Sequence, residues 1–156
     1  MANTPAEVDL KSDLTDDVAL VTGATRGIGA EIAAQLAEHG ATVYAGARDR
    51  DDVTAPDQHA VELDVTEDDE IRAAVDRIEN EQGGLDIVVN NAGIFPESGP
   101  LHEMDTADFD RTMAVNLRGP VVVTKHALPL LVAESGSRVV TLSSGLGQFT
   151  AGEMGG

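Results

Sequence analysis

Short apolar runs alternate along this chain with stretches whose apolar residues recur every three or four positions. The runs predict buried strands, because each is rich in apolar residues and ends at a turn. They lie at residues 18–22, 42–47, 59–63, 85–89 and 138–142. The stretches between them predict helices, since that spacing places the apolar side chains on one helical face. These helices are expected at residues 28–39, from a cap at Thr66 to Gly83, and at 106–133.

The order of the elements predicts the fold class. Strands that alternate with helices form a parallel sheet with helices on both faces, which is the doubly wound α/β or Rossmann fold. Five strands in the order 3-2-1-4-5 are expected within residues 17–156, and residues 1–16 are expected to form a flexible acidic extension. Pro120 and Pro129 fall inside the last helix and predict kinks or breaks there.

Charge narrows the class of protein. The chain carries 28 acidic residues against 10 lysines and arginines, for a net charge of -18. A nucleic-acid mimic or a disordered chain would have such a charge, but the many apolar runs argue against disorder. Phosphates would be repelled by this surface, so nucleic-acid binding is not expected. A halophilic enzyme is favoured, because high salt screens the repulsion between its surface charges.

Several kinds of site and location are not expected. The chain has no cysteine, so it forms neither a disulfide nor a thiolate metal site. Its four histidines lack the spacing of metal ligands. The acidic start does not resemble a signal peptide, and no apolar run approaches the roughly 18 residues of a membrane span. A cytoplasmic protein without a metal is therefore expected.

The turn between the first strand and the first helix is rich in glycine. Its residues, Thr22 to Gly29, have the spacing G-x-x-x-G-x-G. A helix N-terminus offers unpaired N–H groups and a partial positive charge, which suit the diphosphate of a dinucleotide. Gly23 suits a positive φ, Gly27 lets the phosphates approach the backbone, and Gly29 lets the helix pack on the sheet. A purely structural turn is the alternative interpretation.

Further motifs follow this turn at familiar intervals: Asp64-Val65, Asn90-Asn91-Ala92-Gly93, Asn116 and Ser143-Ser144. With Thr22-Gly23-x-x-x-Gly27-x-Gly29 they make the chain resemble the short-chain dehydrogenase/reductase family from residue 17 to about 150. The resemblance implies an oxidoreductase that moves hydride between a nicotinamide dinucleotide and a carbonyl or alcohol substrate. It implies cofactor binding by Gly23, Thr25, Arg26, Gly27, Ile28, Gly29, Arg48, Asp64, Val65, Asn90, Ala92 and Gly93.

The end of the second strand bears on the choice of cofactor. Proteins that bind NAD usually place an acid there for the ribose 2′-OH, whereas this chain has Ala47 followed by Arg48. An arginine suits a 2′-phosphate, and Arg26 points to the same region in relatives that prefer NADP. NADP(H) is therefore expected. NAD(H) stays open, because Asp49 and Asp51 could contact a ribose.

The resemblance also implies catalytic residues. The family uses a serine, an asparagine and a Tyr-x-x-x-Lys pair; Ser144 matches the serine, with Ser143 as the fallback, and Asn116 matches the asparagine. The Tyr–Lys pair is absent, since the lone tyrosine, Tyr44, has no such lysine. The chain is therefore expected to be an inactive part of a longer, homo-oligomeric enzyme, with its fifth strand an exposed, association-prone edge. A catalytically inactive nucleotide-binding module is the alternative, and an epimerase or dehydratase of the family is a weaker one.

Overall fold

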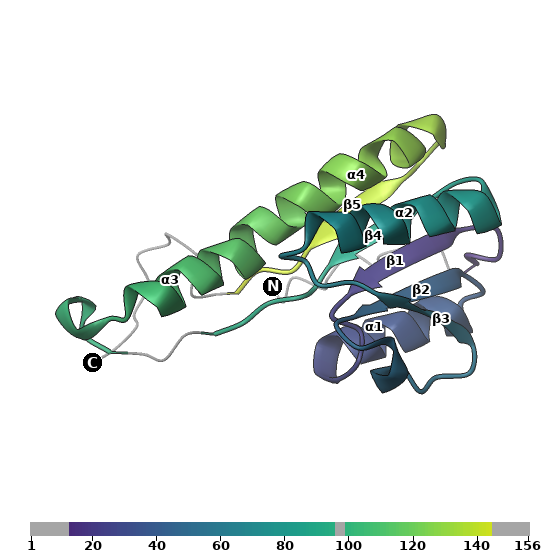
Figure 1. The fold of residues 1–156 in the computed structure, drawn as a ribbon. Coiled ribbons are helices and arrows are strands. Elements are labelled where there is room, and N and C mark those ends of the chain that lie inside the picture. The colour runs from purple at the N-terminus through teal and green to yellow at the C-terminus, as the bar shows by residue number, and fades with distance from the viewer. Residues whose placement is uncertain (1–12, 96–98, 145–156) are drawn as a thin grey trace, which may run out of the picture.

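The computed structural model describes residues 13–95 and 99–144. Within these residues five strands form one parallel sheet in the order β3-β2-β1-β4-β5 (Figure 1), which confirms the predicted fold class and strand order. The strands are β1 (Val18–Thr22), β2 (Thr42–Ala47), β3 (Gln58–Glu62), β4 (Ile87–Asn90) and β5 (Arg138–Thr141).

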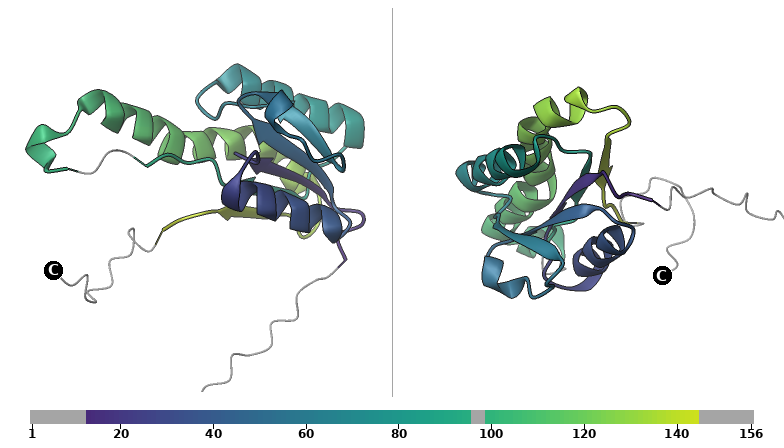
Figure 2. Two further views of the ribbon diagram at one scale, coloured as in Figure 1. Left: turned by 90° about the horizontal axis from the view of Figure 1, so that it is seen from below. Right: turned by 90° about the vertical axis from the view of Figure 1, so that its right-hand side faces the viewer.

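Helices connect the strands and cover both faces of the sheet (Figure 2). The α-helices are α1 (Gly27–Glu38), α2 (Asp68–Gln82), α3 (Thr106–Met113) and α4 (Gly119–Ala133). Two single 3-10 turns, η1 (Arg50–Asp52) and η2 (Leu101–Glu103), lie in the connections, and a π-helical segment, η3 (Ala114–Arg118), joins α3 to α4. Figure 1 shows α3, η3 and α4 as one long rod whose α3 end extends beyond the sheet.

Alternate residues of each inner strand supply two separate cores. Val18 and Leu20 of β1 face α2 and α4, whereas Ala19 and Val21 face α1. Every residue of β1 is buried, because helices cover both sides of this central strand. That arrangement explains why the inner strands are continuous apolar runs in the sequence instead of alternating with polar residues.

The outer strands are less buried: one residue of β3 is buried, and none of β5 is. All four residues of β5 are exposed, and Val139 and Val140 retain 45% and 46% of their accessible surface. Among the described residues β5 pairs only with β4, so its other edge presents free backbone donors and acceptors. The expected exposed apolar edge is therefore present in the structure.

Some predicted helix signals act differently in the structure. Thr66 does not cap α2; Glu67 occupies the N-cap, no side chain caps that helix, and the Thr66 hydroxyl donates to Asp64 instead. The widening at η3 lies just before Pro120, which has no N–H to donate to the carbonyl of Asn116 four residues earlier. At Pro129, by contrast, α4 continues without a break.

The folded part of the chain begins before the predicted boundary at residue 17. Leu14 is buried in the core beneath α1, and its N–H donates to the carbonyl of His39 over 2.8 Å. Leu14 therefore belongs to the core, although the sequence prediction placed it in the extension. Residues 1–12 of that predicted extension lie outside the described residues.

Candidate active site

A cleft of about 550 Å³ opens at the carboxyl ends of the strands. Loops that follow β1, β2, β3 and β4 form its walls, and the last turn of α3 and the start of η3 complete them. The connection after β1 leads to β2 on one side and the connection after β4 leads to β5 on the other, and open α/β sheets bind ligands at such a switch point. The lining residues are Gly23, Thr25, Arg26, Gly27, Ile28, Gly29, Ala47, Arg48, Leu63, Asp64, Val65, Thr66, Asn91, Ala92, Gly93, Ile94, Arg111 and Val115.

The glycine turn is shaped by three different constraints. Gly23 has φ +65, and a side chain on it would come within 2.9 Å of the Ala92 Cα. Gly27 has φ +56, but an added Cβ would meet no atom within 4 Å, because this position opens on the cleft. A Cβ on Gly29 would overlap the Gly23 carbonyl and the Asn91 side chain. Gly29 thus allows close packing of α1 on the turn and on the β4 loop.

The first backbone N–H groups of α1 have no side-chain acceptor. Arg26 is the N-cap of this helix, and there is no acid in its first turn. In contrast, Asp105 caps α3 and three acids fill the first turn of α2. A helix start without acids is conspicuous in a chain of net charge -18. Its free N–H groups and positive dipole end fit an anionic group in the cleft.

Asn91 holds the glycine turn against the loop after β4. Its Nδ2 donates to the carbonyl oxygens of Thr22 and Gly23, each over 3.0 Å. The hydroxyl of Thr22, which is 1% exposed, accepts from the N–H groups of Asn91 and Ala92. These bonds fix the spacing of the two loops that form the cleft. The sequence prediction names neither residue as a site residue, although both lie within its quoted motifs.

The wall contributed by β3 carries Asp64 and Val65. The Asp64 carboxylate accepts from the N–H and the hydroxyl of Thr66, over 2.9 and 2.7 Å, so the turn holds it at the cleft. Val65 is buried, and a Cβ on Gly119 would approach its Cγ2 to 2.9 Å. The start of α4 therefore packs directly on this wall, and its position sets the width of the cleft.

Arginines line the cleft without carboxylate partners. Of the eight arginines, all in the described part of the chain, four form ion pairs: Arg72, Arg77, Arg118 and Arg138. The others are Arg26, Arg48, Arg50 and Arg111, and Arg50 is the one among them that does not line the cleft. Asp64 is the one acid among the lining residues, whereas three arginines line the cleft. These arginines are available to a ligand, because none of them forms an ion pair among the described residues.

Asn116 lies in η3 and uses its side chain to hold the loop after β4. Its Oδ1 accepts from the Ile94 N–H over 2.8 Å, and its Nδ2 donates to the Ile94 carbonyl over 2.7 Å. Gly93 lies beside it, since a Cβ there would be 3.5 Å from Oδ1. In this structure the Asn116 side chain therefore positions the 93–94 backbone at the cleft.

Two other predicted residues lie outside the lining of the cleft. Ser144 is exposed, three residues after the end of β5. Asn90 is 4% exposed at the end of β4, where its Nδ2 donates to the hydroxyls of Thr124 and Thr141. Its Oδ1 has no partner among the described residues. Asn90 thus links β4 to α4 and β5, whereas its neighbour Asn91 reaches the cleft.

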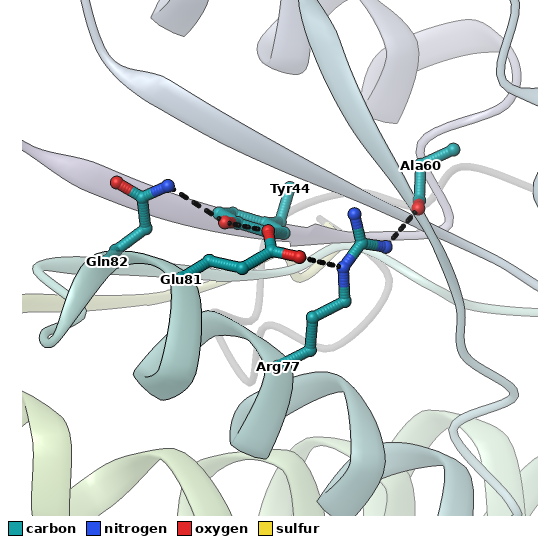
Figure 3. Close-up of polar contacts among 5 residues, drawn as sticks. All are labelled: Tyr44, Ala60, Arg77, Glu81 and Gln82. Carbon is teal, nitrogen blue, oxygen red and sulfur yellow. Dashed lines mark hydrogen bonds and ion pairs between the residues drawn. The ribbon is translucent and has the colours of Figure 1, made fainter.

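Tyr44 is fully buried and does not line the cleft. Its hydroxyl donates to Glu81 over 2.7 Å and accepts from Gln82 over 3.0 Å, both at the end of α2 (Figure 3). Its ring stacks on His59 with centroids 4.9 Å apart. Burial, and then the bond to Glu81, raise the pKa of Tyr44 above its ordinary value. These contacts assign it a structural role, not that of a proton donor.

The described residues, 13–95 and 99–144, also bear on metal binding and on membrane insertion. No cluster of three or more histidine, aspartate or glutamate side chains there could hold a metal ion. None of the helices in the same residues combines the length and the apolar character needed to cross a membrane.

Comparison with known proteins agrees with this geometry. The model of the short chain dehydrogenase family matches residues 17–155. This chain belongs to the short-chain dehydrogenase family. Its curated relatives are oxidoreductases. One is the cis-4-hydroxycyclohexanecarboxylate dehydrogenase of Sinomonas cyclohexanicum, which is 43% identical over 138 residues, 83% of this chain and 55% of that protein.

Other members of the family also match most of this chain and about half of their own length. The galactitol 2-dehydrogenase of Agrobacterium fabrum is 35% identical over 142 residues, which are 86% of this chain and 55% of that enzyme. The ligand-free aldohexose dehydrogenase of Thermoplasma acidophilum superposes with a TM-score of 0.79 at 36% identity, over 85% of this chain and 51% of that one. The short-chain dehydrogenase described here thus spans about half the length of the relatives it matches.

Proposed function

We propose that this short-chain dehydrogenase chain forms the NADP(H)-binding half of an enzyme that exchanges hydride between that cofactor and a carbonyl or alcohol. One observation carries the choice of NADP(H): three of the four arginines without an ion pair among the described residues line the cleft. In a chain of net charge -18, such a cluster favours a ligand with more negative charge than NAD(H).

The cleft also fits the rest of a dinucleotide. The uncapped start of α1 and the open position at Gly27 suit the diphosphate. Asp64 and Val65, on the opposite wall, suit the adenine, and Arg26 and Arg48 suit the 2′-phosphate. The bound cofactor would donate hydride to a carbonyl or accept it from an alcohol, while these groups would orient the cofactor and keep its adenosine end in place.

Ser144 and Asn116, which do not line the described cleft, complete the proposal on the substrate side. The Ser144 hydroxyl, at the carboxyl end of the sheet, would donate a hydrogen bond to the substrate oxygen and orient the carbonyl. Asn116 would keep the backbone at Gly93 and Ile94 in place, through the two bonds it already makes to Ile94. The family's Tyr-x-x-x-Lys pair is not present in this chain, so proton transfer to the substrate is assigned to none of its residues.

A homo-oligomer is part of the same proposal. Leu117, Val121, Leu128 and Val132 recur along η3 and α4 and are between 47% and 72% exposed. Residues at this spacing share one side of the helix, so they form an apolar stripe that a second subunit could cover.

The cofactor preference can be tested by calorimetry in molar KCl. The protein should bind NADPH at least about tenfold more tightly than NADH, and Arg48→Gln should remove most of that difference. Arg50→Gln is the matched control: Arg50 is also unpaired among the described residues, lies two positions away, and does not line the cleft. Equal affinities for NADPH and NADH in the unaltered protein would contradict the choice of NADP(H), and binding of neither would contradict the whole proposal.

A further inference from the structure

Arg111 lines the cleft although no motif in the sequence singles it out. It lies in the last turn of α3, four residues before Val115, so both side chains project from the same side of the helix toward the cleft. A second hollow of about 460 Å³ adjoins the cleft and is lined by Arg26, Arg111 and Asp108 among others. Arg26 and Arg111 line both hollows, and so stand at the boundary between them.

The guanidinium of Arg111 is available to a ligand. Asp108 is three residues earlier on the same helix, a spacing at which ion pairs commonly form. The structure nevertheless gives Arg111 no ion pair with Asp108 or with any other described residue. Elsewhere on this surface the same spacing is used, since Arg72 binds Asp69 over 2.8 Å. Arg111 lines the cleft and forms no ion pair with Asp108, so its guanidinium can bind an anionic ligand.

We infer that Arg111 is a third arginine for the 2′-phosphate of the adenosine, acting from α3 together with Arg26, with which it lines both hollows. The inference rests on the proposed function and extends it. It assigns a residue of α3 to the choice of NADP(H) over NAD(H), in addition to Arg48 after β2 and Arg26 in the glycine turn. Val115, one turn further on, lines the same cleft as Asp64 and Val65, which form its proposed adenine side, and packs against the core cluster that contains Val65. Arg111 therefore lines the cleft together with the groups proposed for the adenosine, and it shares the lining of both hollows with Arg26.

Two small ligands isolate this contact. Adenosine 5′-monophosphate and adenosine 2′,5′-bisphosphate differ only by the 2′-phosphate, and neither needs the nicotinamide end of the cleft. Arg111→Gln should weaken binding of the bisphosphate about tenfold, as expected for the loss of one charge-assisted hydrogen bond, and leave the monophosphate unchanged within about twofold. Arg111→Lys should recover part of the loss, and Arg50→Gln should change neither affinity.

The outcomes separate this inference from the proposed function. If the unaltered protein binds the bisphosphate no more tightly than the monophosphate, both fail. If it prefers the bisphosphate and Arg111→Gln leaves that preference intact, only the role of Arg111 is overturned. Equal weakening of both ligands by Arg111→Gln would also overturn it, because such a residue would hold the adenine or the fold. The double variant with Arg26→Gln should be less than additive, since both groups would contact one phosphate.

Discussion

Gly27 and Gly83 share a backbone conformation but differ in their surroundings. Both have positive φ, +56 and +78, and a Cβ on either would meet no atom within 4 Å. Alanine should therefore cost each site a similar conformational penalty of about 1–2 kcal/mol. Only Gly27 lines the cleft. At the scale of one residue, conformational strain and ligand contact can thus be separated.

We predict that Gly27→Ala and Gly83→Ala lower the free energy of unfolding by about the same amount, roughly 1–2 kcal/mol each. Gly27→Ala should also abolish most NADPH binding, because its methyl group would project into the space proposed for the diphosphate. Denaturant unfolding and calorimetry on the two variants measure both effects. Undiminished NADPH affinity in Gly27→Ala would place the diphosphate elsewhere.

Residue roles could be predicted where they depend on local chain geometry. The positive φ of Gly23 and the open position of Gly27 follow from a tight turn between a strand and a helix. The sequence predicted that Gly29 is needed for packing of the helix on the sheet. In the structure a side chain at Gly29 would overlap Asn91, 62 positions later, which the sequence prediction did not include. Arg111 was missed because its lack of a partner and its place at the cleft exist only after folding.

Between elements, one polar network holds α2 on the sheet. Arg77 donates to Glu81 over 2.7 Å and to the Ala60 carbonyl of the outer strand β3 over 2.8 Å, and Glu81 accepts from Tyr44 of β2 (Figure 3). The bond from Arg77, and then the bond from Tyr44, hold the pKa of Glu81 below its ordinary value. The folded protein thus favours the charged carboxylate.

The sign of the pH dependence follows from that lowered pKa. The stabilisation by Glu81 is fully present above the ordinary glutamate pKa of about 4.3 and is lost as the pH falls through the lowered folded value. We predict that Glu81→Gln lowers the free energy of unfolding at pH 7, and that its difference from the unaltered protein shrinks progressively below about pH 4.3.

The control for this prediction is Glu79→Gln, which removes the same charge from an exposed position on the same helix. Chemical unfolding of the three proteins from pH 7 to pH 3 would measure the effect. An acid dependence of Glu81→Gln that matches the unaltered protein would show that the network contributes no pH-dependent stability.

The bounds of the elements could be predicted where local signals are strong and not where packing decides. Gly83 ends α2 with φ +78, as a glycine after an amphipathic helix predicts. Two features coincide at the π segment before Pro120. That proline has no N–H to donate, and the Asn116 side chain bonds to Ile94, a residue 22 positions away. The sequence predicted a kink or break at Pro120, and the structure has a π-helical segment before it instead.

For the whole molecule, the dominant feature is its net charge of -18. Ion pairs offset few of the acids among the described residues, so mutual repulsion should destabilise the compact state at low ionic strength. At 1 M salt the screening length falls to about 3 Å, which removes most repulsion between exposed groups. We predict that the midpoint of thermal unfolding rises by about 5–10 °C between roughly 0.1 M and 2 M KCl.

A variant that replaces Glu62, Asp76 and Glu79 by their amides provides the comparison, because all three acids are exposed and outside the cleft. Its unfolding midpoint should be higher at low salt and should rise less with KCl. Equal salt dependence in both proteins would assign the effect to general salting-out and remove the halophilic interpretation.

The sequence by itself determined the succession and type of the elements along the chain and the glycine turn, because hydrophobic period and turn chemistry act between neighbouring residues. The strand order followed from the doubly wound fold class that this succession indicates. Only the tertiary structure decided that Asn91 bonds to Gly23, that Asn116 bonds to Ile94, and that Arg111 and Arg26 line one cleft. Those pairs are separated by tens of residues, and their arrangement depends on how helices pack on the two faces of one sheet. Whether a charge finds a partner or stays free for a ligand is decided by the same packing.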